Sequence, residues 1–128
     1  MKRQNISTGA KWEDIVGYSR AVRIGNIVEV SGTVAVQEGK TVGIGNAYLQ
    51  SKHILVTIKD SLEKAGAKLD DVIRTRMFVT DITRWEEVAK AHGEVFGKIK
   101  PATSMVEVSA LIDPEYMVEI EATAIIND

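Results

Sequence analysis

The chain has 128 residues, of which 45% are hydrophobic and 27% are charged, ordinary values for a folded domain and unlike those of a disordered chain. Sixteen Lys and Arg against eighteen Asp and Glu leave a net charge of -2, which disfavours nucleic acid as the main partner. Cysteine is absent and no apolar segment is long enough to cross a membrane, so we expect one cytoplasmic domain spanning residues 1–128, without disulfides or thiolate chemistry.

A β-hairpin is predicted over residues 18–36. The segments YSRAVRI and IVEVSGTVAV are rich in Val and Ile, and they flank Gly25-Asn26, a pair suited to a tight primed turn. A glycine-containing loop follows. Asn46 is a good N-cap for the next helix, whose apolar face includes Leu55, Ile58 and Leu62 and which stops at Gly66.

The second half of the chain predicts a strand, a helix and two more strands. The run DVIRTRMFVTD alternates, with Ile73, Thr75, Met77 and Val79 on one face. A capping box of Thr83 and Glu86 indicates the start of the second helix, which ends before Pro101. The last two strands are predicted from residues 103 and 117 onward.

Both helices have a single apolar stripe, so we expect them on one face of a single mixed sheet in an α+β fold. The opposite face then combines charged, polar and apolar side chains. Its expected members are Glu29, Ser31, Thr33, Val72, Arg74, Arg76, Phe78, Thr103, Met105, Glu107, Met117, Glu119, Glu121 and Ile125. Such a face is too polar for a core and too apolar for water, which predicts that other copies of the chain cover it, with clefts at the seams.

The charged residues of that face have two readings, because ion-pair networks and active sites look alike in a sequence. They either form cross-strand salt links that set the assembly, or they line a site. His92 lies on the helix stripe beside Phe96, which favours a structural role over a catalytic one. The only other histidine is His53, and neither metal-ligand spacing nor a complete phosphate-binding glycine motif is present, so no metal or cofactor is expected.

Several short segments carry a family likeness in their order and spacing. They are GYSRAV at residues 17–22, VSG at 30–32, LEKAGA at 62–67, DV at 71–72 and PATSMVEVSALIDPEYMVEIEATAI from residue 101. With these marks the chain resembles the reactive intermediate deaminase family, also called Rid or YjgF. The resemblance implies a chorismate-mutase-like fold of the bacillus type, a homotrimer with ligand clefts between subunits, and hydrolysis of 2-aminoacrylate and related imines to keto acids and ammonia.

The resemblance also implies a set of site residues. Tyr18, Ser31 and Glu119 match cleft residues of the family archetype, with Tyr18 and Glu119 in catalytic roles. The arginine of the archetype's Pro-Ala-Arg-Ser motif is Thr103 here, and its helix asparagine is Ala89. A guanidinium grips a carboxylate through two charge-assisted hydrogen bonds, whereas a hydroxyl offers one neutral donor. We therefore expect hydrolysis of 2-aminoacrylate to be absent or much slower.

Arg76 is the predicted replacement cation, because it should point to the same side of the sheet as Thr103 and Glu119. Met105 and His92 complete the expected substrate-binding set, and the expected ligand is a small anionic metabolite. Three functions remain open. They are a hydrolytic deaminase of small imines or enamines, a trimer that binds a small carboxylate without turnover, and an endoribonuclease, which the lack of a basic stripe or stacking platform disfavours.

Overall fold

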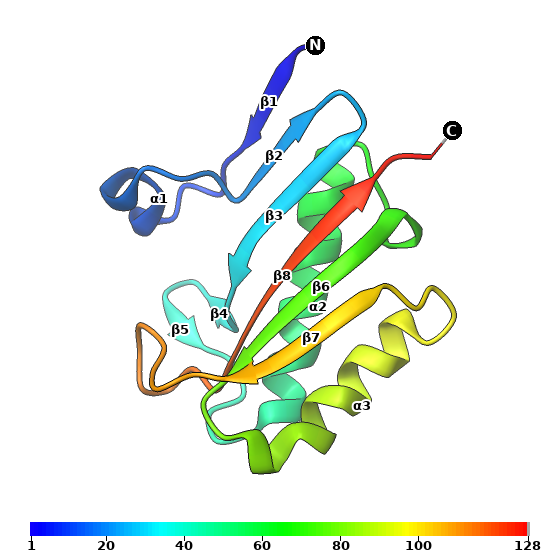
Figure 1. Ribbon diagram of the computed structural model, residues 1–128. Coiled ribbons are helices and arrows are strands. Elements are labelled where there is room, and N and C mark those ends of the chain that lie inside the picture. Colours follow the sequence, from blue (N-terminus) through cyan, green and yellow to red (C-terminus); the bar gives the residue numbers. More distant parts are fainter. Residues whose placement is uncertain (128) are drawn as a thin grey trace.

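The computed structural model describes residues 1–127 as a two-layer α+β arrangement (Figure 1). In chain order the elements are β1 (Arg3–Ile6), α1 (Lys11–Val16), β2 (Ala21–Ile24), β3 (Ile27–Thr33), β4 (Val36–Gln37), β5 (Lys40–Thr41), α2 (Ala47–Lys64), the 3-10 helix η1 (Leu69–Asp71), β6 (Val72–Val79), the 3-10 helix η2 (Ile82–Arg84), α3 (Trp85–Phe96), β7 (Ala102–Glu107) and β8 (Val118–Ile125).

Six strands form one mixed sheet in the order β1-β2-β3-β8-β6-β7, and β4 and β5 form a separate small hairpin. All neighbouring strands are antiparallel except β6 and β7, which run parallel. A parallel pair needs a crossover connection, and α3 supplies it. The crossover leaves β7 as an edge strand of the sheet.

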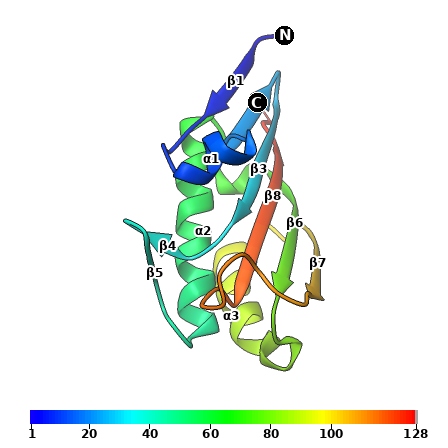
Figure 2. The ribbon, with the colours of Figure 1, turned by 90° about the vertical axis from the view of Figure 1, so that its left-hand side faces the viewer.

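The two long helices, α2 and α3, lie on the same side of the sheet, as predicted (Figure 2). The core lies between these layers, where Val28, Ile120 and Ala124 of the sheet meet Ile54 and Ile58 of α2. We call this side of the sheet the inner face. The opposite side, the outer face, carries no helix within residues 1–127.

The predicted start and end of the first long helix are confirmed. The Asn46 side chain accepts a hydrogen bond of 2.9 Å from the Leu49 backbone N–H, which satisfies one of the free donors at the start of α2. Gly66, just after the helix, has a φ of +87°, a conformation that costs glycine little. The hairpin turn is also as predicted, since Ile24 pairs with Ile27 and Gly25 has a φ of +61°.

Two bulges overturn parts of the predicted alternation. In β6 the register with β8 shifts between Val72 and Arg74, so Val72 is buried in the core while Ile73 is 48% exposed, the reverse of the prediction. In β3 the register shifts between Val30 and Thr33, and Thr33 is buried rather than on the outer face. A bulge adds one residue to a strand, so every side chain beyond it changes face.

The predicted alternation of β7 is offset by one residue, so the side chains expected on the outer face lie on the inner face. Its register places Thr103 opposite Thr75 and Met105 opposite Met77, and both partners are buried on the inner face. Thr103, Met105 and Glu107 therefore point to the inner side, and the Glu107 carboxylate accepts a hydrogen bond of 3.0 Å from the Ile82 backbone N–H. This arrangement excludes Glu107 from the predicted outer-face charge network.

Two further details differ from the sequence-based prediction. The second helix begins with η2, whose N-cap is Asp81, and the Thr83 hydroxyl bonds to that carboxylate rather than forming the predicted capping box. The strand β1 and the six-residue helix α1 were not predicted at all.

Candidate functional site

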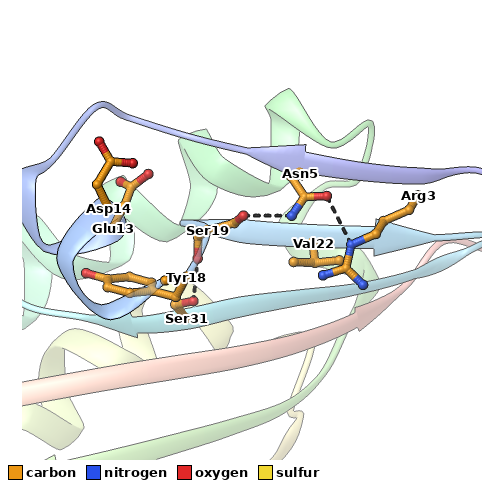
Figure 3. A pocket seen from close by; sticks show the side chains of 9 residues that line it. Arg3, Asn5, Glu13, Asp14, Tyr18, Ser19, Val22 and Ser31 are labelled. Carbon is orange, nitrogen blue, oxygen red and sulfur yellow. Dashed lines mark hydrogen bonds between the residues drawn. The ribbon is translucent and has the colours of Figure 1, made fainter.

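An open hollow of about 510 Å³ lies where α1 meets the beginning of β2, and its surroundings are shown in Figure 3. Its lining is mostly polar and comes from β1, α1, the turn after α1, β2 and β3. The lining residues are Arg3, Asn5, Glu13, Asp14, Gly17, Tyr18, Ser19, Val22 and Ser31. The predicted residues Tyr18 and Ser31 thus share one cavity.

The local fold positions both residues. Gly17 ends α1 with a φ of +87°, and this turn carries the chain out of the helix at Tyr18. The Ser31 hydroxyl donates a 2.6 Å hydrogen bond to the Ser19 carbonyl, and the Ser31 backbone N–H donates to the Arg20 carbonyl at 3.0 Å. Ser31 therefore has its hydroxyl proton engaged and fixes the spacing between β2 and β3.

Arg20 is a site residue that the sequence analysis did not identify. Its guanidinium carbon lies 5.8 Å from the centre of the Tyr18 ring, and its Nη2 donates to the Gly32 carbonyl. Its Nε, like that of Arg74, is enclosed and has no hydrogen-bond partner among residues 1–127. The guanidinium makes one hydrogen bond within residues 1–127, through Nη2, so terminal N–H groups of Arg20 are left for an acceptor outside the described chain.

Glu119 lies against the same stretch of β3. A methyl group placed on Gly32 would come within 2.9 Å of the Glu119 carboxyl carbon, so the acid packs directly on the glycine backbone. Burial raises the pKa of Glu119, the positive charge of Arg20 opposes that rise, and the negative charge of Glu121 adds to it. Within the described residues Glu119 forms no ion pair with Arg20 at 4.0 Å or less.

We call Tyr18, Arg20, Ser31 and Glu119 the outer-face cluster. It combines an aromatic ring, a guanidinium with an unused donor, and a half-buried carboxyl group whose pKa is raised. A carboxyl group with a raised pKa can act as a base toward a water molecule, and a cation beside it can hold an anion.

Arg76, the predicted replacement cation, is on the outer face but is engaged elsewhere. Its Nη1 lies 3.5 Å from a carboxylate oxygen of Glu121, and it pairs across the sheet with Glu121 rather than with Glu119. Arg74, its neighbour on the same face, donates to the Ser104 hydroxyl at 2.8 Å. The cation that acts on Glu119 is thus Arg20.

Thr103 and His92 belong to a second group, on the inner face beside the edge strand β7. The buried Thr75 hydroxyl lies 2.9 Å from Nε2 of His92 and 2.8 Å from the Thr103 hydroxyl. The His92 ring is half-buried against Phe96, and burial lowers its pKa. We call Thr75, His92 and Thr103 the edge cluster; Met105, next along β7, packs against the core.

The two clusters lie on opposite faces of the sheet. The outer-face cluster belongs to β3, β8 and the segment before β2, whereas the edge cluster belongs to β6, β7 and α3. A single cavity in one chain cannot be lined by both. Within one copy, therefore, the predicted site residues do not come together.

Residues 1–127 contain neither a membrane-spanning helix nor a metal-binding cluster. No helix in this range is both long and apolar enough to span a membrane. Nor does the described chain hold a group of three or more His, Asp and Glu side chains suited to a metal ion.

Comparison with known proteins gives consistent matches. Residues 8–126 match the family model described as endoribonuclease L-PSP. The chain is 34% identical over 108 residues to the 3-aminoacrylate deaminase RutC of Acinetobacter baylyi, covering 84% of this chain and 85% of that protein. A RutC family protein of Pyrococcus abyssi is 33% identical, covering 97% and 98%. The crystal structure of Rv2704 from Mycobacterium tuberculosis, a member of the YjgF/YER057c/UK114 family, superposes with a TM-score of 0.90 at 49% identity, covering 98% and 100%.

Proposed function

The chain belongs to the endoribonuclease L-PSP family, which includes the Rid and YjgF proteins, and from that membership we propose that it is a hydrolytic deaminase of small enamines and imines that carry a carboxylate. The observation that carries the proposal is the outer-face cluster, in which Glu119 packs on Gly32 beside Arg20. The fold is the chorismate-mutase-like α+β fold expected for this family.

The chemistry follows from the residues of this cluster. An enamine tautomerises to an imine, water adds to the imine carbon, and the carbon–nitrogen bond then breaks to release ammonia and leave an oxo acid. Glu119 orients the attacking water and accepts its proton, since a carboxyl group with a raised pKa is a stronger base than an exposed one. Arg20 holds the substrate carboxylate through its unused N–H groups.

The substrate class is suggested by a relative. The Acinetobacter baylyi protein bears the name 3-aminoacrylate deaminase, and 3-aminoacrylate is an enamine with a carboxylate. Charge complementarity with Arg20 agrees with an anionic substrate of this size.

We further propose that the working site lies between copies in a homotrimer. The outer face exposes Ile27, Ile73 and Val106, each close to half accessible, around the Arg74 and Arg76 side chains. Covering this face with the edge of the next copy would remove the apolar groups from water and would bring the edge cluster to the outer-face cluster. Binding without turnover is the competing function, favoured by Thr103 in place of the motif arginine.

The test is turnover of an enamine generated in the assay. We expect 3-aminoacrylate to be hydrolysed faster than its spontaneous decay, Glu119→Gln to lower kcat at least about 100-fold, and Arg20→Gln mainly to raise KM. Glu63→Gln, an exposed carboxylate on α2, is the matched control and should leave both constants unchanged. Substrate binding without turnover above the spontaneous rate would show a binding protein instead.

A further inference from the structure

Thr75 is the centre of a short hydrogen-bonded chain that ends at the protein surface. Its hydroxyl is fully buried and lies between Nε2 of His92 at 2.9 Å and the Thr103 hydroxyl at 2.8 Å. A hydroxyl has a single proton and two acceptor lone pairs, so Thr75 donates to at most one of these neighbours. When it donates to one and accepts from the other, the chain has a direction.

Two arrangements give the chain a direction; in a third, both neighbours donate to Thr75, and the Thr75 proton then has no acceptor within residues 1–127. In the inward direction Thr103 donates to Thr75, and Thr75 donates to an unprotonated Nε2 of His92. In the outward direction Nε2–H donates to Thr75, Thr75 donates to Thr103, and the Thr103 proton is left for a third acceptor. That acceptor exists, because the Pro101 carbonyl lies 3.2 Å from the Thr103 hydroxyl. The outward direction satisfies all three contacts, whereas the inward direction loses the contact with Pro101.

The two directions differ in the tautomer of His92. Burial lowers the pKa of this imidazole, so near pH 7.5 the ring is neutral and carries one proton. The outward direction puts that proton on Nε2. The contact between Thr103 and Pro101 is long, and Thr103 is exposed, so a stronger acceptor from solvent can take the proton from Pro101.

We propose that the relay from His92 through Thr75 fixes Thr103 as a hydrogen-bond donor to the substrate carboxylate. This inference rests on the proposed function, and it assigns a specificity role to the position where the family archetype has an arginine. A carboxylate has lone pairs for several donors, so Thr103 of one copy and Arg20 of the next can bind the same group. Successive donors in a chain polarise one another, which strengthens the last one.

Nuclear magnetic resonance of the histidine nitrogens tests the direction of the relay without any turnover. In a His53→Gln background His92 is the only imidazole, which makes the spectrum unambiguous. We expect a neutral ring protonated at Nε2 at pH 7.5. A ring protonated at Nδ1 would show that the relay runs inward, and would overturn the proposal.

Pyruvate, which has a carboxylate and no imine nitrogen, is the binding probe. We expect Thr103→Val and Thr75→Val each to raise the Kd for pyruvate about three- to tenfold, the effect of one hydrogen bond, and Thr75→Ser to restore it. An unchanged Kd in both valine variants, or no binding of pyruvate to the unmodified protein, would refute the role of Thr103. Failure of the proposed function has a different signature, namely no turnover of enamines while pyruvate binding still depends on Thr75.

Discussion

Replacing Gly32 by alanine should displace the Glu119 carboxyl group while leaving the sheet folded. The new methyl group would lie 2.9 Å from the Glu119 carboxyl carbon and 3.2 Å from its Cγ, with a carboxylate oxygen closer still. Carbon atoms in contact prefer about 3.5–4.0 Å, so the acid has to retreat by roughly 1 Å. Because only the end of a flexible side chain has to move, the clash is relieved at Glu119 and not in the backbone.

The consequence is a loss of activity without a matching loss of stability. A displacement of about 1 Å in a catalytic group can cost on the order of a hundredfold in rate. Gly32 has no positive φ, so alanine fits its backbone conformation and would by itself stabilise the fold by about 0.4–1 kcal/mol through the unfolded chain. We expect kcat for enamine hydrolysis to fall about 100-fold and the melting temperature to change by only a few degrees.

Gly93→Ala is the matched control. Gly93 lies in α3, a methyl group there would meet nothing within 4 Å, and alanine in a helix is favoured by up to about 1 kcal/mol. This variant should melt slightly higher and keep its activity. If Gly32→Ala keeps full activity, Glu119 does not act from its position on Gly32, and the reasoning about the outer-face cluster is refuted.

Three further predictions concern titration and buried hydrogen bonds. Burial raises the pKa of Glu119, so its charge destabilises the fold as pH rises above about 4.5. At pH 7, Glu119→Gln should therefore be inactive and have a melting temperature equal to or above that of the unmodified protein. A lower melting temperature would contradict this prediction. Burial acts to raise the pKa of Glu13, but hydrogen bonds from Thr8 and Ser7 outweigh it and leave the pKa lowered. Glu13→Gln should therefore lower the free energy of unfolding by about 1–3 kcal/mol at neutral pH, and by progressively less as acid protonates the native carboxylate. A difference in stability that does not change with pH would contradict this prediction. The buried Gln50 amide forms hydrogen bonds with the backbone at residues 43, 115 and 117. Gln50→Leu should therefore lower the free energy of unfolding, measured by denaturant titration, by about 3 kcal/mol. A change below about 1 kcal/mol would show that water hydrates these backbone groups in the variant.

The sequence predicted best where one face of an element is uniformly apolar. In β8, Val118, Ile120 and Ala122 alternate with Glu119 and Glu121, and both faces were assigned correctly because only one register buries the apolar set. The first long helix has the same property, together with a clear N-cap at Asn46. Its boundaries were accordingly predicted well.

The failures have physical causes that a single sequence conceals. Val72 and Ile73 are both good core residues, so nothing in their identity reveals the bulge that buries the first and exposes the second. In β7 both alternating sets mix polar and apolar residues, because an edge strand is only half covered. Thr103 was therefore placed on the wrong face. The strand β1, with the sequence RQNI, has no hydrophobic period at all.

The candidate site was predictable in part. Tyr18, Ser31 and Glu119 were proposed through a family resemblance; the structure places Tyr18 and Ser31 in one cavity and packs Glu119 on Gly32, and their roles remain a prediction. Arg20 was present in the segment GYSRAV but had no signal of its own, because its importance comes from its position beside the Tyr18 ring and from the effect of its charge on Glu119. These are properties of the folded chain, as is the link from His92 through Thr75 to Thr103.

The central claim is that the outer face of one copy and the β7 edge of another complete a single site, and subunit complementation tests it most directly. One variant would carry Glu119→Gln and the other Thr103→Glu, whose added carboxylate repels an anionic substrate. Each alone should be inactive. In mixed trimers assembled at random, about one seam in four joins an intact outer face to an intact edge, so roughly a quarter of the unmodified activity should return. A mixture as inactive as its two components would show that both residues act from the same copy, and would contradict the account.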